Sequence, residues 1–195
     1  MSRAPALQSF LDALAAGFGQ ATDTAAVRVA EKIFTAGGRA TLPGQIKPHR
    51  LPVCEYIEPA VSNARSADGD AARVANALAE LESDLQWRRR VPSAADSDDF
   101  QHNHANAVVL GPDGLEVRND IQIGISLLAP LTTYPDHRHP PEEIYFVLSA
   151  GEWRQNTLPW HEPGIGGVVH NEPDIVHAMR AADAPLLAVW CLWMG

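Results

Sequence analysis

Hydrophobic residues in the first hundred positions recur at intervals of three and four, the spacing of one face of an α-helix. Glycines and capping residues divide this pattern into separate segments. Helices are therefore predicted from about Leu7 to Gly17, from Asp23 or Thr24 to Gly37, and from about Asp70 to Arg89. The stretch from Leu42 to Pro59 is rich in proline and is predicted to be irregular.

The pattern changes after the polar residues 96–99. Between residues 121 and 127, large aliphatic residues alternate with small or polar ones, which is the period of a β-strand with one buried face. The sequence Gly111-Pro-Asp-Gly114 indicates a hairpin turn. Further strands are predicted near residues 107–110, 143–148, 166–170 and 185–193. Short strands separated by turns of this kind are typical of a β-sandwich or small barrel.

The two patterns predict an α+β protein, with a helical N-terminal region over residues 1–100 and a β-barrel over residues 101–195. A chain of 195 residues is long enough for one well-cored domain with a helical addition. The helices are expected either to cover the open end of the barrel or to mediate a homodimer.

Charge and composition exclude some classes of partner. The net charge of −9 argues against a nucleic acid or an anionic membrane surface. The one dense basic cluster, Arg88–Arg90, is interpreted as the complement of a helix C-terminus. Cys54 and Cys191 are far apart and are predicted to be buried free thiols. No signal peptide or membrane-spanning run is predicted, so a cytoplasmic location is expected.

Candidate chemistry is concentrated between Tyr134 and His177. His137, His139 and Glu143 form an H-x-H-x3-E pattern, and His177 follows some thirty residues later. Residues two apart on a strand share a face, so His137 and His139 can both point into a barrel. Any one histidine alone is better explained as an ordinary surface or core residue. Together, the imidazoles and the carboxylate predict one divalent metal ion, such as zinc, iron or manganese.

This pattern and the distant His177 resemble the two metal motifs of the cupin superfamily, whose fold is a double-stranded β-helix barrel of the jelly-roll type. The first cupin motif normally opens with a glycine, and residues 131–134 replace it here, while Gly151 takes the closing position. The sequence from Tyr134 to Ser149 is similar to that of the cupin-type dimethylsulfoniopropionate (DMSP) lyases, especially the DddQ type. Those proteins also have an alanine-rich helical N-terminal half.

The resemblance implies a metal-dependent carbon–sulfur lyase that cleaves DMSP to acrylate and dimethyl sulfide. It implies metal ligation by His139, Glu143, Tyr145 and His177. It implies that Tyr134 is the general base and that Tyr145 is a displaceable ligand at the same site. His137 becomes a pocket residue beside the metal, whereas a generic cupin would use it as a ligand, and the sequence leaves both roles open.

The chemistry of DMSP explains why such residues are needed. The proton α to a carboxylate is weakly acidic, and a metal ion can neutralise the charge that develops when it leaves. A tyrosine base needs its pKa lowered from about 10. Aromatic faces can hold the sulfonium, and the candidates for this are Tyr134, Tyr145, Trp190, Trp193 and Tyr56. Because Trp190 and Trp193 have opposite parity, at most one of them points into the barrel from a regular strand.

Two other functions fit the metal motif. A cupin dioxygenase would use iron and oxygen at the same ligands, but it gives no role to Tyr134 or Tyr145. A cupin binding module would capture a small metabolite without turnover. Oxygen consumption identifies the first, and ligand binding that is insensitive to the loss of the Tyr134 hydroxyl identifies the second.

Overall fold

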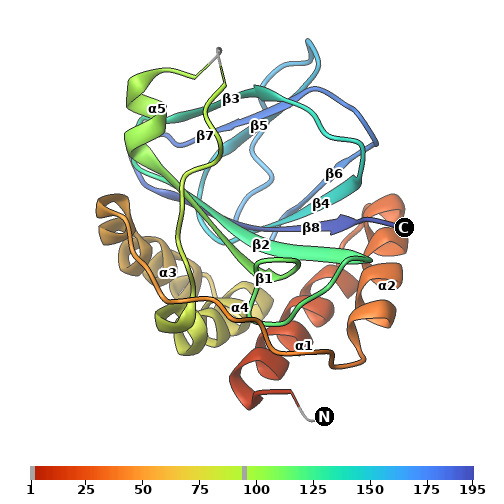
Figure 1. Cartoon of the computed structure of the whole chain (residues 1–195). Helices are drawn as coiled ribbons and strands as arrows, with labels where there is room; N and C mark the ends of the chain where they lie inside the picture. Colours follow the sequence, from red (N-terminus) through yellow and green to blue (C-terminus); the bar gives the residue numbers. More distant parts are fainter. Residues whose placement is uncertain (1–2, 94–95) are drawn as a thin grey trace.

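The alternating pattern in the second half of the chain forms two antiparallel sheets in the computed structural model, which describes residues 3–93 and 96–195 (Figure 1). The strands are β1 (His104–Leu110), β2 (Ile121–Leu128), β3 (Thr133–His137), β4 (Glu142–Val147), β5 (Glu152–Gln155), β6 (Val168–Asn171), β7 (His177–Arg180) and β8 (Leu186–Trp193). One sheet has the order β1-β2-β8-β4-β6 and the other β3-β7-β5. The two sheets form the jelly-roll barrel of an α+β cupin fold, as the sequence predicts.

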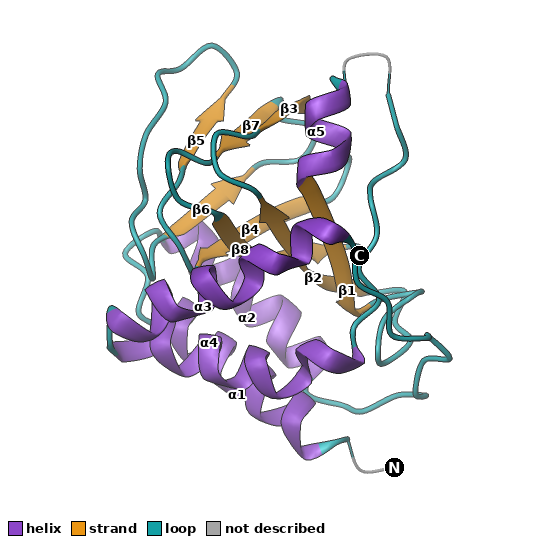
Figure 2. Cartoon of the chain, turned by 90° about the vertical axis from the view of Figure 1, so that its left-hand side faces the viewer, coloured by secondary structure: helices purple, strands orange, loops and turns teal. Residues whose placement is uncertain are grey.

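The helices pack against the outer face of the five-stranded sheet, not over the open end of the barrel (Figures 1 and 2). They are α1 (Pro5–Gly19), α2 (Thr24–Gly37), α3 (Ile57–Ser66) and α4 (Gly69–Leu81), with the short 3-10 helices η1 (Pro52–Tyr56) and η2 (Glu82–Asp84). Phe146 of β4 meets Phe18 of α1 edge-on, with ring centroids 5.6 Å apart. The outer face of the sheet is apolar and needs this cover, so the expectation of helices over the open end is wrong.

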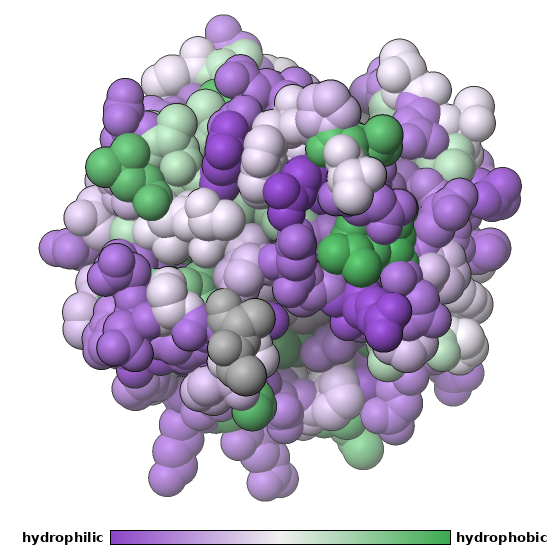
Figure 3. All heavy atoms as spheres, turned by 90° about the horizontal axis from the view of Figure 1, so that it is seen from above, coloured by the Kyte–Doolittle hydropathy of each residue, from purple (hydrophilic) through white to green (hydrophobic). Residues whose placement is uncertain are grey.

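The strand β2 shows how the two faces of the large sheet differ. Residues Ile121, Ile123 and Ile125 belong to the core shared with the helices, while Ser126 lines a cavity inside the barrel. A Cβ atom on Gly124 would lie 2.1 Å from Cζ2 of Trp190. Glycine is therefore what leaves room for the indole ring of Trp190 on the inner face. The side of the barrel away from the helices is mostly hydrophilic (Figure 3).

The third predicted helix is shorter than its periodicity suggested. α4 ends at Leu81, and the chain then turns so that the buried Trp87 donates from Nε1 to Glu82 at 2.9 Å. Arg88 lies in extended chain and exchanges backbone hydrogen bonds of 2.9 and 2.8 Å with Asn106 of β1. The interpretation of Arg88–Arg90 as the end of a helix is therefore wrong.

The proline-rich stretch is more regular than predicted. η1 and the first turn of α3 occupy its second half, and Pro59 is the third residue of α3. Amide groups in the first turn of a helix have no partner within the helix, so proline costs little there. A further helix, α5 (Asp98–Asn103), is capped by Ser97, whose side chain accepts from the amide of Phe100 at 3.1 Å.

Other expectations agree with the structure. Asp23 caps α2 by accepting from two backbone amides, and residues 111–114 form the predicted turn between β1 and β2. Cys54 and Cys191 are buried free thiols. Within the described residues, no helix has both the length and the apolar character needed to cross a membrane. The predicted region 1–100 includes four residues (1, 2, 94 and 95) outside the description.

Candidate metal centre

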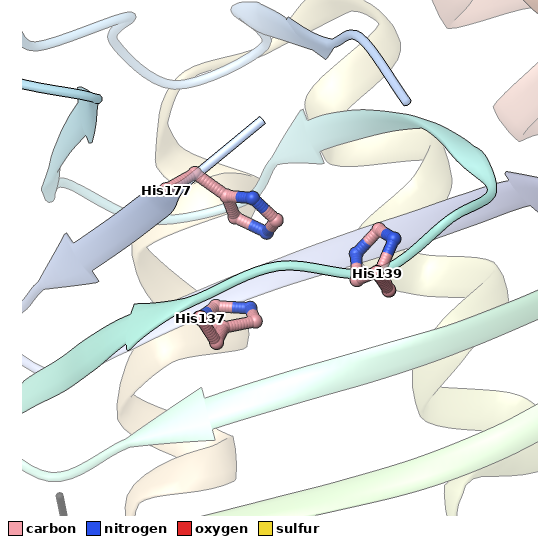
Figure 4. Close-up of side chains that lie close together, drawn as sticks. All are labelled: His137, His139 and His177. Carbon is pink, nitrogen blue, oxygen red and sulfur yellow. The ribbon is translucent and has the colours of Figure 1, made fainter. Parts of the chain in front are cut away.

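His137, His139 and His177 converge inside the barrel (Figure 4). One nitrogen of each ring lies within 4.8 Å of the others. His137 ends β3 and pairs with His177, the first residue of β7, while His139 lies in the connection to β4. The sequence predicted that His137 and His139 lie on one strand and meet His177. His139 instead lies beyond the end of β3. The structure brings the three histidines together.

A β-bulge accounts for the inward position of both Tyr134 and His137. These residues are three apart and would face opposite sides of a regular strand. The pairing of β3 with β7 shifts register between them, so both face the interior, with ring centroids 4.6 Å apart. Tyr134 is therefore close to the histidines because of a local irregularity that the alternation of residues does not show.

The same tautomer is fixed in all three imidazoles. Each Nδ1 lies close to a backbone carbonyl: His137 to Pro135 at 2.9 Å, His139 to Pro141 at 3.1 Å and His177 to Ile175 at 3.0 Å. A nitrogen in such a contact carries the hydrogen and donates it, so each Nε2 carries a lone pair. The backbone thus orients three acceptor atoms toward a common point, which is the arrangement of a metal site.

Glu143 brings a carboxylate to the same point. Its Oε2 lies 3.1 Å from Nε2 of His177 and 3.4 Å from Nε2 of His139. Burial raises the pKa of Glu143, but His139 and His177, when their Nε2 atoms carry a proton, more than reverse this and hold the pKa well below its usual range. Asn171 donates to Oε2 at 2.8 Å and orients the carboxylate.

The donor set fits a divalent cation. Nε2 of His177 is buried and has no hydrogen-bond partner among the described residues, although the Glu143 carboxylate is close. Two atoms that both carry lone pairs and no hydrogen repel each other at this distance. A cation between them would satisfy both.

The two phenols of the site remain protonated in the chain as it stands. Burial raises the pKa of Tyr145 well above its usual value, and the negative charge of Glu143 adds to this. Burial also raises the pKa of Tyr134, while the guanidinium of Arg90 and a hydrogen bond from Asn106 oppose the effect. A base role for Tyr134 therefore requires additional positive charge close to its oxygen.

These groups line a cavity of about 160 Å³. Its walls are Asn106, Ser126, Tyr134, His137, His139, Glu143, Tyr145, Trp190 and Leu192. Larger hollows lie elsewhere on the described surface, such as one of about 820 Å³ beside Arg118. That hollow contains none of the clustered histidines. The small cavity is therefore the better candidate for chemistry.

The structure brings only one of the two predicted tryptophans to the site. Trp190 lines the cavity, whereas Trp193 packs on the helical side of the sheet beside Arg28 and Lys32 of α2. Tyr56 belongs to that same outer core. The expectation that Trp193 contacts substrate does not fit this position, because the sheet separates it from the cavity.

Several residues near the site were not predicted, among them Asn106, Ser126 and Arg90. Asn106 and Ser126 line the cavity, and the parity of β2 could have indicated Ser126. The guanidinium carbon of Arg90 lies 5.0 Å from the ring centroid of Tyr134, and Arg90 is paired with Asp96. The sequence did not indicate that Arg90 lies near the site, because its segment had the pattern of a helix.

We predict that metal-free protein becomes less stable in mild acid because of His137. Burial, together with the nearby His177, lowers the pKa of His137 from 6.5 to about 4. At pH values between these two pKa values, the unfolded chain binds a proton at His137 that the folded chain does not bind. The free energy of unfolding therefore falls as pH falls. From pH 7 to pH 5 this loss should be roughly 1–2 kcal/mol.

Urea unfolding in the presence of chelator measures this effect. His137→Gln should remove that part of the pH dependence while the rest remains. An identical dependence in the two proteins would contradict the assignment.

The chain matches known proteins over most of its length. The family model for dimethylsulfoniopropionate lyase matches residues 3–188. The DMSP lyase DddQ of Ruegeria pomeroyi is 28% identical over 83% of this chain and 79% of its own length. Its crystal structure superimposes over 98% of this chain and 92% of that chain, with a TM-score of 0.73 and 23% identity.

A second relative is a Cereibacter sphaeroides protein named as a DMSP lyase, DddL. It is 30% identical over 65% of this chain. The match spans 53% of that protein, about half its length.

Proposed function

The chain belongs to the dimethylsulfoniopropionate lyase family, and we propose that it is a metal-dependent lyase that cleaves DMSP to acrylate and dimethyl sulfide. One observation supports this beyond family membership. A single cavity is lined by His137, His139, the Glu143 carboxylate and the phenols of Tyr134 and Tyr145. Nε2 of His177 lies 3.1 Å from Oε2 of that carboxylate and completes the histidine cluster. Neither an oxygenase nor a simple binding site requires the two phenols.

The metal would be held by His139, Glu143 and His177, with Tyr145 as a fourth, displaceable group. Nε2 of His137 is close enough to the others to replace Tyr145 in this set. The mixture of imidazole and carboxylate suits zinc, iron or manganese. A bound divalent ion would supply positive charge that stabilises the developing enolate and lowers the pKa of a nearby phenol.

Tyr134 would act as the base in a β-elimination. As the phenolate, which a bound divalent ion would favour, its oxygen takes the proton from the carbon next to the substrate carboxylate and becomes a neutral phenol. The electrons of that C–H bond form the double bond of acrylate. The bond between the β-carbon and sulfur breaks, and its electron pair leaves with neutral dimethyl sulfide. The position of Tyr134 beside His137, on the wall of the same cavity, supports this role.

The sulfonium would lie against Trp190. We predict that Trp190→Leu raises the KM for DMSP roughly two- to thirtyfold, because a cation on an aromatic face gains about 0.5–2 kcal/mol. Trp193→Leu is the matched control, because Trp193 lies on the other side of the sheet. Equal KM values for the two variants would contradict a sulfonium site at Trp190.

Metal removal tests the proposal as a whole. Purified protein is given DMSP with and without chelator, and dimethyl sulfide is measured by headspace gas chromatography. Release should stop with chelator and return when zinc, iron or manganese is added. An elimination consumes no oxygen, so an oxygen electrode in the same reaction should read no uptake.

Other outcomes favour the competing functions. Oxygen uptake without dimethyl sulfide would identify an iron dioxygenase. Saturable binding of DMSP without product from metal-loaded protein would identify a binding module. We also propose a cytoplasmic location, which fractionation of the source cells would test.

A further inference from the structure

Asn106 and Ser126 form a polar pair inside the barrel that the proposed reaction leaves unused. They lie directly opposite each other on β1 and β2. The Ser126 hydroxyl donates to Oδ1 of Asn106 at 2.7 Å. Both line the cavity that Tyr134, His137 and His139 also line. The Asn106 amide still has N–H donors to offer within this cavity.

The hydrogen bond from Ser126 fixes the orientation of the Asn106 amide. Because Oδ1 accepts from Ser126, the Nδ2 group presents only donors to its other neighbours. Tyr134 lines the same small cavity as this amide, and the Asn106 side chain opposes the rise in the pKa of Tyr134 that burial causes. The backbone of Asn106 is paired with Arg88 on one side and with β2 on the other, so the amide rests on a rigid strand.

We propose that Asn106, oriented by Ser126, is a positioning residue for the base Tyr134. The amide N–H binds the Tyr134 oxygen from the side of β1. The hydrogen of the Tyr134 phenol must then point away from β1 into the cavity. After this hydrogen is lost, the lone pair that accepts the substrate proton points the same way. Asn106 keeps its own hydrogens throughout. This inference rests on the proposed lyase function.

Rate measurements test the role of the amide. Asn106→Ala should lower kcat for dimethyl sulfide release about ten- to a hundredfold, as expected for loss of a hydrogen bond to a group that becomes charged, with little change in KM. Asn106→Asp should lower it at least as much, because an acceptor replaces the donor. Ser126→Ala should have a smaller effect, and Ser126→Thr, which keeps the hydroxyl, should restore the rate.

Gln122→Ala is the control. It removes a polar side chain from the same face of β2, outside the cavity lining. If Asn106→Ala raises KM and leaves kcat unchanged, the amide binds the substrate carboxylate and the proposal is overturned. If Asn106→Ala behaves like the control, the pair has no role in positioning the base and the proposal is again overturned.

Coupling to Tyr134 separates a positioning role from a merely structural one. In a Tyr134→Phe background, Asn106→Ala should produce little further loss of rate, because the group on which it acts is gone. With substrate deuterated at the α-carbon, the isotope effect on kcat should increase in Asn106→Ala. Additive losses and an unchanged isotope effect would contradict the proposal.

An NMR measurement keeps this inference independent of the proposed activity. The chain has three tyrosines, so the Cζ resonances of ¹³C-labelled tyrosine can be assigned by single substitution to phenylalanine. Asn106→Ala should move the Tyr134 resonance and leave that of Tyr56 in place. An unmoved Tyr134 resonance would overturn the inference. A shifted resonance in a protein that releases no dimethyl sulfide would overturn only the lyase proposal.

Discussion

Tyr134→Phe should lower kcat for dimethyl sulfide release by about 10²- to 10⁴-fold, the usual contribution of a general base. Phenylalanine keeps the buried ring against Phe100 and His137 and removes only the oxygen that accepts the proton. Substrate binding depends on other walls of the cavity, so KM should change little. Headspace gas chromatography under saturating DMSP measures the rate.

Tyr56→Phe is the matched control for this substitution. Tyr56 lies in η1 on the helical side of the sheet and should tolerate the change with full activity. Metal content and the unfolding temperature should be the same in both variants and the wild type. If Tyr134→Phe retains activity within a few-fold of wild type, another group is the base. The phenol of Tyr145 would then be the next candidate, because it lines the same cavity.

His177→Ala should remove the metal and, with it, the activity. His177 is the ligand contributed by β7, is only 2% exposed, and has its Nε2 held toward Glu143 and the other two histidines. Even residues that only orient metal ligands contribute about ten- to a hundredfold to metal affinity, so loss of a direct ligand should cost more. Metal content after dialysis, measured by mass spectrometry, should fall from about one ion per chain to a small fraction of that.

The control is His161→Ala, which removes an exposed histidine from the connection between β5 and β6. Full metal content in His177→Ala would contradict the assigned site. The same measurement decides between the two roles of His137. If His137→Ala loses metal as His177→Ala does, His137 is a ligand. If it retains metal and loses rate, it is a pocket residue.

Much of the site was predictable because it depends on short segments. The spacing of His137, His139 and Glu143 confines three groups to a few residues around one turn, and the inward parity of β4 places Tyr145 beside Glu143. The cupin resemblance then connects this segment with His177. The alternation of side chains along β8 also predicts that Trp190 and Trp193 lie on opposite faces of the sheet. It does not predict which of the two faces the cavity.

Other features depend on contacts between distant segments. The sequence by itself determined the α+β class, the limits of α2, those of α1 to within two residues, and the cluster of metal-binding groups, because each depends on local periodicity or spacing. Tertiary structure alone decided that the helices cover the sheet, that Arg90 meets Tyr134, and that Asn106 faces Ser126. The bulge in β3 is also decided by the tertiary structure, because it depends on pairing with β7. Local pattern determines which face of an element is apolar, but only packing determines what that face meets.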